Sequence, residues 1–112
     1  MSRAKGLKKV ATLAVESGLG GASSDGSVAL TPADTWVQVP DTVPATDYLL
    51  VVQRENEDGV IRWSFDNNGV PSATNGLKMD GQPIIVELRG GEVLYFGSTT
   101  DGDDVNYTTK II

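Results

Sequence analysis

The hydrophobic pattern is most informative between Tyr48 and Asp66. Residues 48–54 are almost continuously apolar, which is typical of a central strand covered on both faces. Residues 60–66 alternate between apolar and polar positions, which is typical of a strand with one buried face. The polar residues 55–59 between them end in Asp-Gly, a pair that tolerates positive φ. The pattern predicts a β-hairpin over residues 48–66.

Short strands of the same kind are expected along the rest of the chain, separated by turn signals rich in Gly, Pro, Asn and Asp. Ile84–Leu88 and Val93–Phe96 flank a short polar turn and predict a second hairpin. Further strands are expected at residues 28–30, 35–39, 77–79 and 105–109. About seven or eight short strands without a convincing helix favour an all-β fold. We therefore expect an antiparallel β-sandwich of jelly-roll character with an extended N-terminal arm.

The first part of the chain differs in composition from the rest. Residues 1–15 are basic and then small and apolar, whereas Ser17–Ser27 consists mostly of Gly, Ser and Ala. The latter composition buries too little apolar area to become ordered alone, so it indicates a flexible linker. The predicted organisation is an arm plus linker over residues 1–27 and a β-sandwich domain over residues 28–112. The alternative is that the first segment is an edge strand of the domain.

Charge supports a separate role for the arm. The formal net charge of the chain is −6. Residues 1–9 carry four basic residues and no acid, whereas the remainder carries five basic residues against fifteen acidic ones. The acidic body would repel phosphate, which argues against nucleic-acid binding. An arm that docks on an acidic protein surface is predicted, the alternative being a basic terminus without fixed structure. The predicted contact residues are Arg3, Lys5, Leu7, Lys8, Lys9, Val10, Leu13 and Val15.

Composition narrows the possible chemistry. The chain has no cysteine, which excludes disulfides and zinc–thiolate sites, and no histidine, the commonest general base and metal ligand. These counts argue against an enzyme, and no catalytic residue, cofactor or metal site is predicted. No apolar run approaches the roughly 20 residues of a membrane helix. The apolar segment Val10–Val15 is also too short for a signal peptide. We therefore expect a soluble, unprocessed chain.

Two weaker candidate sites have plain structural interpretations. The acidic run Asp101–Asp104 offers oxygen ligands suited to Ca²⁺, but it lacks the Glu that closes an EF-hand loop, so a solvated loop tip is favoured. Aromatic side chains can stack on sugars, and Trp36 and Tyr107 are the best placed for this role. Trp63 is assigned to the core because it alternates with Ile61 and Phe65.

One wider pattern covers about two-thirds of the chain, from Trp36 to Tyr107. Its features are a strand that ends in Gln53-Arg54, the strand Ile61–Asp66, Leu77 followed by Asp80-Gly81, and Val93–Gly97. This pattern resembles small bacteriophage virion proteins of β-sandwich type. The resemblance implies a structural role on the capsid or at the head–tail junction, and it brings no catalytic residues. The basic arm is not part of the shared pattern.

These observations lead to one main functional hypothesis. The chain is expected to be a capsid decoration (cement) protein of the virion, attached by its arm to the major capsid protein or another virion protein. It is expected to self-associate, with a trimer favoured, because association covers exposed strand edges. The alternatives are a head–tail connector or tail-fibre-base protein, and a carbohydrate- or receptor-binding module that uses Trp36 and Tyr107.

Overall fold

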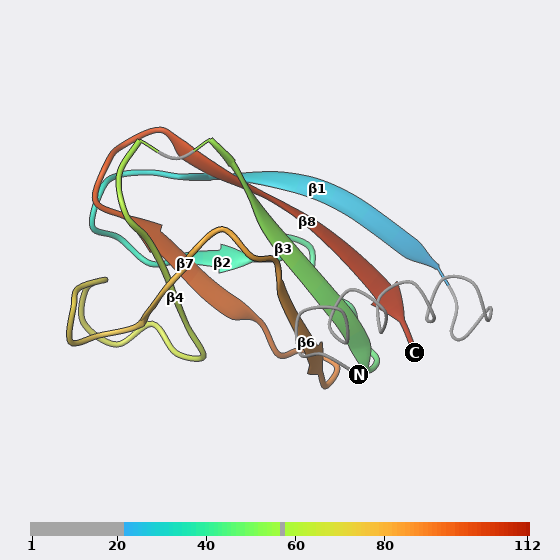
Figure 1. Ribbon diagram of the computed structural model, residues 1–112. Helices are drawn as coiled ribbons and strands as arrows, with labels where there is room; N and C mark the ends of the chain where they lie inside the picture. Colours follow the sequence, from blue (N-terminus) through green and yellow to red (C-terminus); the bar gives the residue numbers. More distant parts are fainter. Residues whose placement is uncertain (1–21, 57) are drawn as a thin grey trace, which may run out of the picture.

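The computed structural model describes residues 22–56 and 58–112, and the regular structure in these two ranges is all β-strand. Sheet A has the strand order β1-β8-β3-β6, and sheet B has the order β2-β7-β4-β5 (Figure 1). The strands are β1 (Ser23–Leu30), β2 (Val37–Val39), β3 (Tyr48–Asn56), β4 (Ile61–Ser64), β5 (Leu77–Lys78), β6 (Ile84–Leu88), β7 (Leu94–Ser98) and β8 (Asp103–Ile111).

The strand pairing is that of an eight-stranded jelly roll. Antiparallel pairs join β1 to β8, β2 to β7, β3 to β6 and β4 to β5. The first two strands along the chain therefore pair with the last two, and the chain passes from one sheet to the other at every connection except that between β4 and β5. This arrangement confirms the predicted antiparallel β-sandwich of jelly-roll character.

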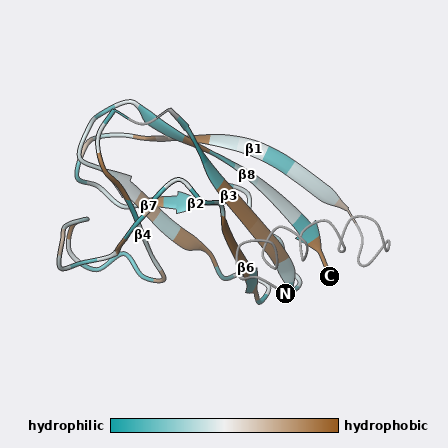
Figure 2. Ribbon diagram, viewed as in Figure 1, coloured by the Kyte–Doolittle hydropathy of each residue, from teal (hydrophilic) through white to brown (hydrophobic). Residues whose placement is uncertain are grey.

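The core lies between the two sheets. On β3 the inward side chains of Tyr48, Leu50 and Val52 have no exposed surface, and on β7 the same is true of Leu94 and Phe96. The hydropathy colouring shows apolar residues concentrated on β3, β6 and β7 (Figure 2). Burial of each large apolar side chain contributes about 1.5–3 kcal/mol, so these alternating inner positions dominate the stability of the fold.

The predicted hairpin over residues 48–66 is wrong, although its two strands are present. β3 lies in sheet A and β4 lies in sheet B, so the two strands face each other across the core instead of pairing. The loop between them is held from a distant part of the chain. The backbone N–H groups of Asp58 and Gly59 donate to the Asp103 carboxylate at 2.7 and 3.0 Å. Because β3 and β4 lie in opposite sheets, each strand can bury its apolar face against the same core.

The second predicted hairpin, residues 84–96, is wrong for the same reason. β6 belongs to sheet A and β7 to sheet B. The polar turn between them is as tight as expected, because the Glu92 N–H donates to the Arg89 carbonyl at 3.0 Å. The Glu92 carboxylate also accepts from the Arg89 N–H at 2.8 Å. A tight turn therefore reverses the chain here without pairing the strands that it joins.

The predicted linker is wrong where the structure describes it. β1 begins at Ser23, not at Val28, and it pairs with β8 along its whole length, as an edge strand of sheet A. Backbone hydrogen bonds to β8 order this Ser- and Gly-rich stretch. At Gly26 a larger residue would not fit. A Cβ atom at Gly26 would lie 2.5 Å from ring atoms of Tyr107, which packs beneath it. The proposed linker residues before Ala22 lie outside the described residues.

Candidate functional site

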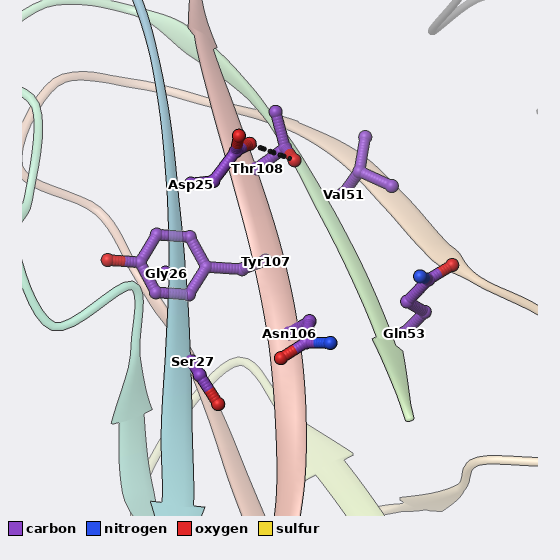
Figure 3. A pocket seen from close by; sticks show the side chains of 8 residues that line it. All are labelled: Asp25, Gly26, Ser27, Val51, Gln53, Asn106, Tyr107 and Thr108. Carbon is purple, nitrogen blue, oxygen red and sulfur yellow. Dashed lines mark hydrogen bonds between the residues drawn. The ribbon is translucent and has the colours of Figure 1, made fainter. Parts of the chain in front are cut away.

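The outer face of sheet A is hollowed where β1, β8 and β3 run side by side (Figure 3). The hollow has a volume of about 610 Å³. It is lined by Asp25, Gly26, Ser27, Val51, Gln53, Asn106, Tyr107 and Thr108. Most of these side chains are polar and uncharged, and Asp25 supplies a carboxylate.

Hydrogen bonds organise the polar side chains on this face. The Thr108 hydroxyl donates to the Asp25 carboxylate at 2.6 Å, which links β8 to β1 (Figure 3). The Asn106 amide donates to the Glu55 carboxylate at 2.6 Å, which links β8 to β3. Both acceptors are exposed carboxylates, so the face offers fixed negative charge to a bound partner.

The same outer face carries a strip of aliphatic side chains beside the hollow. Alternation along β3 turns Leu49 and Val51 away from the core, and the register places Ile85 of β6 beside Val51. Leu49 lies between Glu87 of β6 and Lys110 of β8. The continuous apolar pattern of β3 therefore reflects two faces, one in the core and one on the outside of sheet A, where the described residues form no covering layer.

A second surface lies at the opposite end of the molecule from the C-terminus, around the loop between β4 and β5 (Figure 1). A hollow of about 360 Å³ is lined there by apolar residues and by Ser64, Thr74 and Gly76. We define its apolar residues as the loop surface: Trp63, Phe65, Ala73 and Leu77. Phe65 is 65% exposed and Leu77 is 60% exposed, whereas Trp63 is half-buried and packs against the core.

The assignment of Phe65 to the core face is wrong. β4 ends at Ser64, and Phe65 then leaves the sandwich while its ring keeps an edge-to-face contact with Trp63, at 5.5 Å between centroids and 72° between planes. Val70, in the same loop, is 57% exposed. Sequence reasoning missed this surface, because the Asn-Gly pairs at residues 68–69 and 75–76 indicate turns but do not show which side chains the loop exposes.

Hydrogen bonds hold the loop that carries this surface. The Asn75 side-chain amide donates to the carbonyls of Asn68 and Val70 at 2.6 and 2.9 Å. The Trp36 indole N–H donates to the Asn68 carbonyl at 3.2 Å, and its ring lies against Gly76. Ser72 and Asn75 exchange backbone hydrogen bonds of 3.1 and 3.0 Å. The loop surface is therefore presented on a defined backbone.

The sugar-stacking pair predicted from the sequence does not exist as an exposed platform. Trp36 is half-buried and holds the loop just described. Tyr107 is 6% exposed, points into the core and donates its hydroxyl to Asp41. Burial and the Asp41 carboxylate raise the pKa of Tyr107 to about 12, so the phenol stays protonated as a donor. The prediction failed because β8 turns alternate residues inward, and Tyr107 falls on the inner set.

The acidic run Asp101–Asp104 is not a uniformly solvated loop tip. Asp103 has no exposed surface. Its carboxylate accepts from the Ser98 hydroxyl at 2.6 Å and from the N–H groups of Asp58 and Gly59. Burial acts to raise the pKa of Asp103, but these three hydrogen bonds outweigh it and hold the pKa below its usual value. The carboxylate therefore anchors a loop, and the Asp101 carboxylate accepts from the Thr31 hydroxyl.

The remaining sequence predictions concern the N-terminal arm, metal binding and membrane helices. The arm residues Arg3, Lys5, Leu7, Lys8, Lys9, Val10, Leu13 and Val15 lie outside the described residues. Within residues 22–56 and 58–112, no group of three or more acidic side chains is placed to hold a metal ion. In the same ranges, no helix has the length and apolar character needed to cross a membrane.

Comparisons with known proteins add one distant likeness. No protein-family model matches the chain, and no curated protein matches it. A solved structure from Bacillus endospore appendages, described as a novel family of disulfide-linked pili, is similar at a TM-score of 0.43 and 11% sequence identity. The likeness covers 81% of this chain and 88% of that chain. A likeness at this level does not indicate a shared function.

Proposed function

We propose that this protein is a structural virion protein: a capsid decoration protein that attaches to the outside of a bacteriophage shell. The observation that carries the proposal is the loop surface, which exposes Phe65 and Leu77 on a backbone fixed by hydrogen bonds. Large apolar side chains held outside a core are a feature of surfaces that bind other proteins. Because the loop is already ordered, little conformational entropy is lost when a partner covers it.

The N-terminal residues supply the second contact in this proposal. β1 begins near the C-terminus, at the end of the sandwich opposite the loop surface (Figure 1). A subunit with contacts at both ends can bridge neighbouring shell subunits, and two linked weak contacts give a much tighter attachment than either alone. The cationic residues of the segment suit an acidic surface on the major capsid protein. Self-association, with a trimer favoured, covers the free edges of the two sheets.

The test is co-sedimentation of the purified full-length chain with shells that lack it. Replacement of the exposed apolar side chains in the double variant Phe65→Ser/Leu77→Ser removes the burial that drives docking. We expect binding to weaken about a hundredfold, since the two large side chains together contribute about 2.8 kcal/mol when covered. The matched control is Ile112→Ser, because Ile112 is 50% exposed at the other end of the molecule. Its binding is expected to stay unchanged.

Two outcomes would contradict the proposal. If the unmodified chain does not sediment with the shells, it is not a decoration protein of that particle. If the double variant binds as tightly as the control, the loop surface takes no part in attachment. The number of copies per particle separates the decoration role from a head–tail connector or tail-fibre-base role: hundreds are expected on a shell, against about six or twelve in a tail ring.

A further inference from the structure

We propose that Asn68 is a self-modification site, at which the side-chain amide is converted to a carboxylate after attack by the backbone nitrogen of Gly69. The reaction consumes water and releases ammonia, and it needs no enzyme. It adds one negative charge to the loop between β4 and β5, the loop that carries the loop surface (Figure 1). This inference concerns the chemistry of the chain itself and does not depend on the proposed function.

Two Asn-Gly pairs lie in this loop, Asn68-Gly69 and Asn75-Gly76. Because glycine has no Cβ atom, its nitrogen can closely approach the side-chain carbonyl carbon of the preceding asparagine. The nitrogen gives its proton to solvent and bonds to that carbon, the C–NH2 bond breaks, and the amine takes a proton from water and leaves as ammonia. Water then opens the resulting succinimide ring at one of its two carbonyl carbons, which gives aspartate or isoaspartate.

Two N–H donors meet at the carbonyl oxygen of the peptide unit that supplies the attacking nitrogen. The Trp36 indole N–H donates to the Asn68 carbonyl oxygen at 3.2 Å, and the Asn75 side-chain amide donates to the same oxygen at 2.6 Å. This oxygen carries part of the negative charge when the Gly69 nitrogen loses its proton, because the two atoms belong to one amide group. Donors placed where charge develops stabilise the transition state, as in an oxyanion hole. The two donors therefore activate the Gly69 nitrogen.

The reacting groups of this pair are accessible. Asn68 and Gly69 are both exposed to solvent. Among the described residues, neither the Asn68 side chain nor the Gly69 N–H has a hydrogen-bond partner. The side chain can therefore turn toward the Gly69 nitrogen without breaking a hydrogen bond, and solvent can take up the proton of that nitrogen.

The second pair is restrained. Asn75 is half-buried, and its side-chain amide donates to the carbonyls of Asn68 and Val70 at 2.6 and 2.9 Å. Both hydrogen bonds must break before the side chain can turn toward the Gly76 nitrogen. The Asn75 carbonyl oxygen accepts from the Ser72 N–H at 3.1 Å, its one recorded donor in the described ranges. The structure therefore favours reaction at the first pair and slows it at the second.

Peptide mapping tests this difference. The full-length chain is incubated at neutral pH, digested briefly with trypsin and analysed by mass spectrometry with fragmentation. Trypsin cuts after Arg62 and Lys78, so both pairs fall in one peptide and are compared under identical conditions. We expect Asn68 to react about thirtyfold faster than Asn75 in the folded chain, because two hydrogen bonds restrain Asn75. In urea, where neither pair keeps its hydrogen bonds, the two rates should be nearly equal.

A donor variant separates activation from simple exposure. Trp36→Phe keeps an aromatic ring but removes the indole N–H that donates to the Asn68 carbonyl. We expect it to slow the reaction at Asn68 about fivefold, because a hydrogen bond to a charged acceptor is stronger than one to a neutral acceptor. The matched control is Trp63→Phe, since the donors to that carbonyl are Trp36 and Asn75. The control should leave the rate at Asn68 unchanged.

Three results would overturn the inference. The first is an Asn68 that reacts no faster than Asn75 in the folded chain. The second is a Trp36→Phe variant that reacts at Asn68 as fast as the unmodified chain. The third is a variant that reacts there faster, because a raised rate would mean that the hydrogen-bonded loop protects Asn68 instead of activating it.

Discussion

At the scale of single residues, the Asp103 carboxylate connects three distant parts of the chain. It begins β8, yet it binds the N–H groups of Asp58 and Gly59, more than forty positions earlier, and the hydroxyl of Ser98 on β7. A buried carboxylate is costly unless its oxygens are hydrogen-bonded, and here three donors meet that need. In the loop that carries the chain from sheet A to sheet B, Asp58 and Gly59 are therefore held by one side chain.

This anchor predicts a pH-dependent stability. The folded-state pKa of Asp103 lies below its unfolded value. Its contribution to stability is therefore present above the unfolded pKa of 3.8 and is lost as pH falls from there through the lower folded pKa. Asp103→Asn replaces one accepting oxygen with a donor that faces other donors. We expect it to lower the free energy of unfolding at pH 7 by about 2 kcal/mol and to flatten the decline in acid.

Urea unfolding followed by tryptophan fluorescence at pH 7 and pH 3 measures both effects. Asp104→Asn is the matched control, because Asp104 is the neighbouring acid on the outer face of the same strand. The control should retain the decline in acid seen for the unmodified chain. An Asp103→Asn variant that loses as much stability between the two pH values as the unmodified chain would show that the anchor is not the cause.

At the scale of elements, β1 shows how pairing can order a sequence that looks unstructured. Its first five residues have no large side chain, but they lie opposite Asn106–Lys110 in unbroken register. The last three residues add Val28 and Leu30, both buried in the core. The first part of β1 is therefore stabilised by backbone pairing with β8, and the last part also by burial of its side chains in the core.

A truncation separates the two halves. A chain that begins at Val28 keeps the buried side chains but loses the pairing of Ser23–Ser27 with β8, and it uncovers Tyr107. We expect it to be less stable than a chain that begins at Ala22 by about 3 kcal/mol, from several net backbone hydrogen bonds. Thermal and urea unfolding of the two chains decide this. Equal stability of the two chains would show that the domain begins at Val28, as the composition predicted.

The same elements explain what could be predicted from the sequence. The strand pattern of Ile61–Ser64 and Ile84–Leu88 is local, so alternation and β-branched residues located them. Whether two strands joined by a tight turn pair or cross the core depends on contacts outside the turn. The loop between β3 and β4 is held by Asp103, and β1 is held by its pairing with β8 at the far end of the chain. Neither long-range contact leaves a local signal, and the two predicted hairpins and the linker failed for that reason.

The candidate surfaces were predictable to different degrees. The continuous apolar pattern of β3 predicted a strand covered on both faces, but the outward positions Leu49 and Val51 lie on the outside of sheet A, where the described residues form no further layer. The exposure of Phe65 and Leu77 did not follow, because alternation gives the face of a side chain but not the point where a strand leaves the sheet. That point depends on how Trp36 and Asn75 hold the intervening loop.

At the scale of the whole molecule, the two sheets are expected to differ in their resistance to opening. β3 and β8 are each paired on both sides in sheet A and bury Tyr48, Leu50, Val52 and Val105 completely. β2 and β5 are short edge strands of sheet B. Amide hydrogens that are exposed only by global unfolding exchange most slowly. The amides of β3 and β8 should therefore take up deuterium last.

Hydrogen exchange followed by mass spectrometry measures this order peptide by peptide. β1 serves as the internal comparison, because it is long but paired on one side in the described residues. It should exchange faster than β8 and more slowly than β5. A β1 that exchanges as slowly as β8 would mean that its outer edge is covered in solution, and rapid exchange of β3 would contradict the core described above.

The position of β8 has a consequence for biosynthesis. This strand fits between β1 and β3, which were made much earlier, and it supplies a partner to each of them. A nascent chain stopped before Asp103 would hold two unsatisfied rows of amides, with a gap where the missing strand belongs. Such an intermediate invites a strand from any neighbouring polypeptide on the ribosome. Productive folding must therefore wait until β8 has been synthesised and has left the ribosome, and products terminated before Asp103 should collect in inclusion bodies.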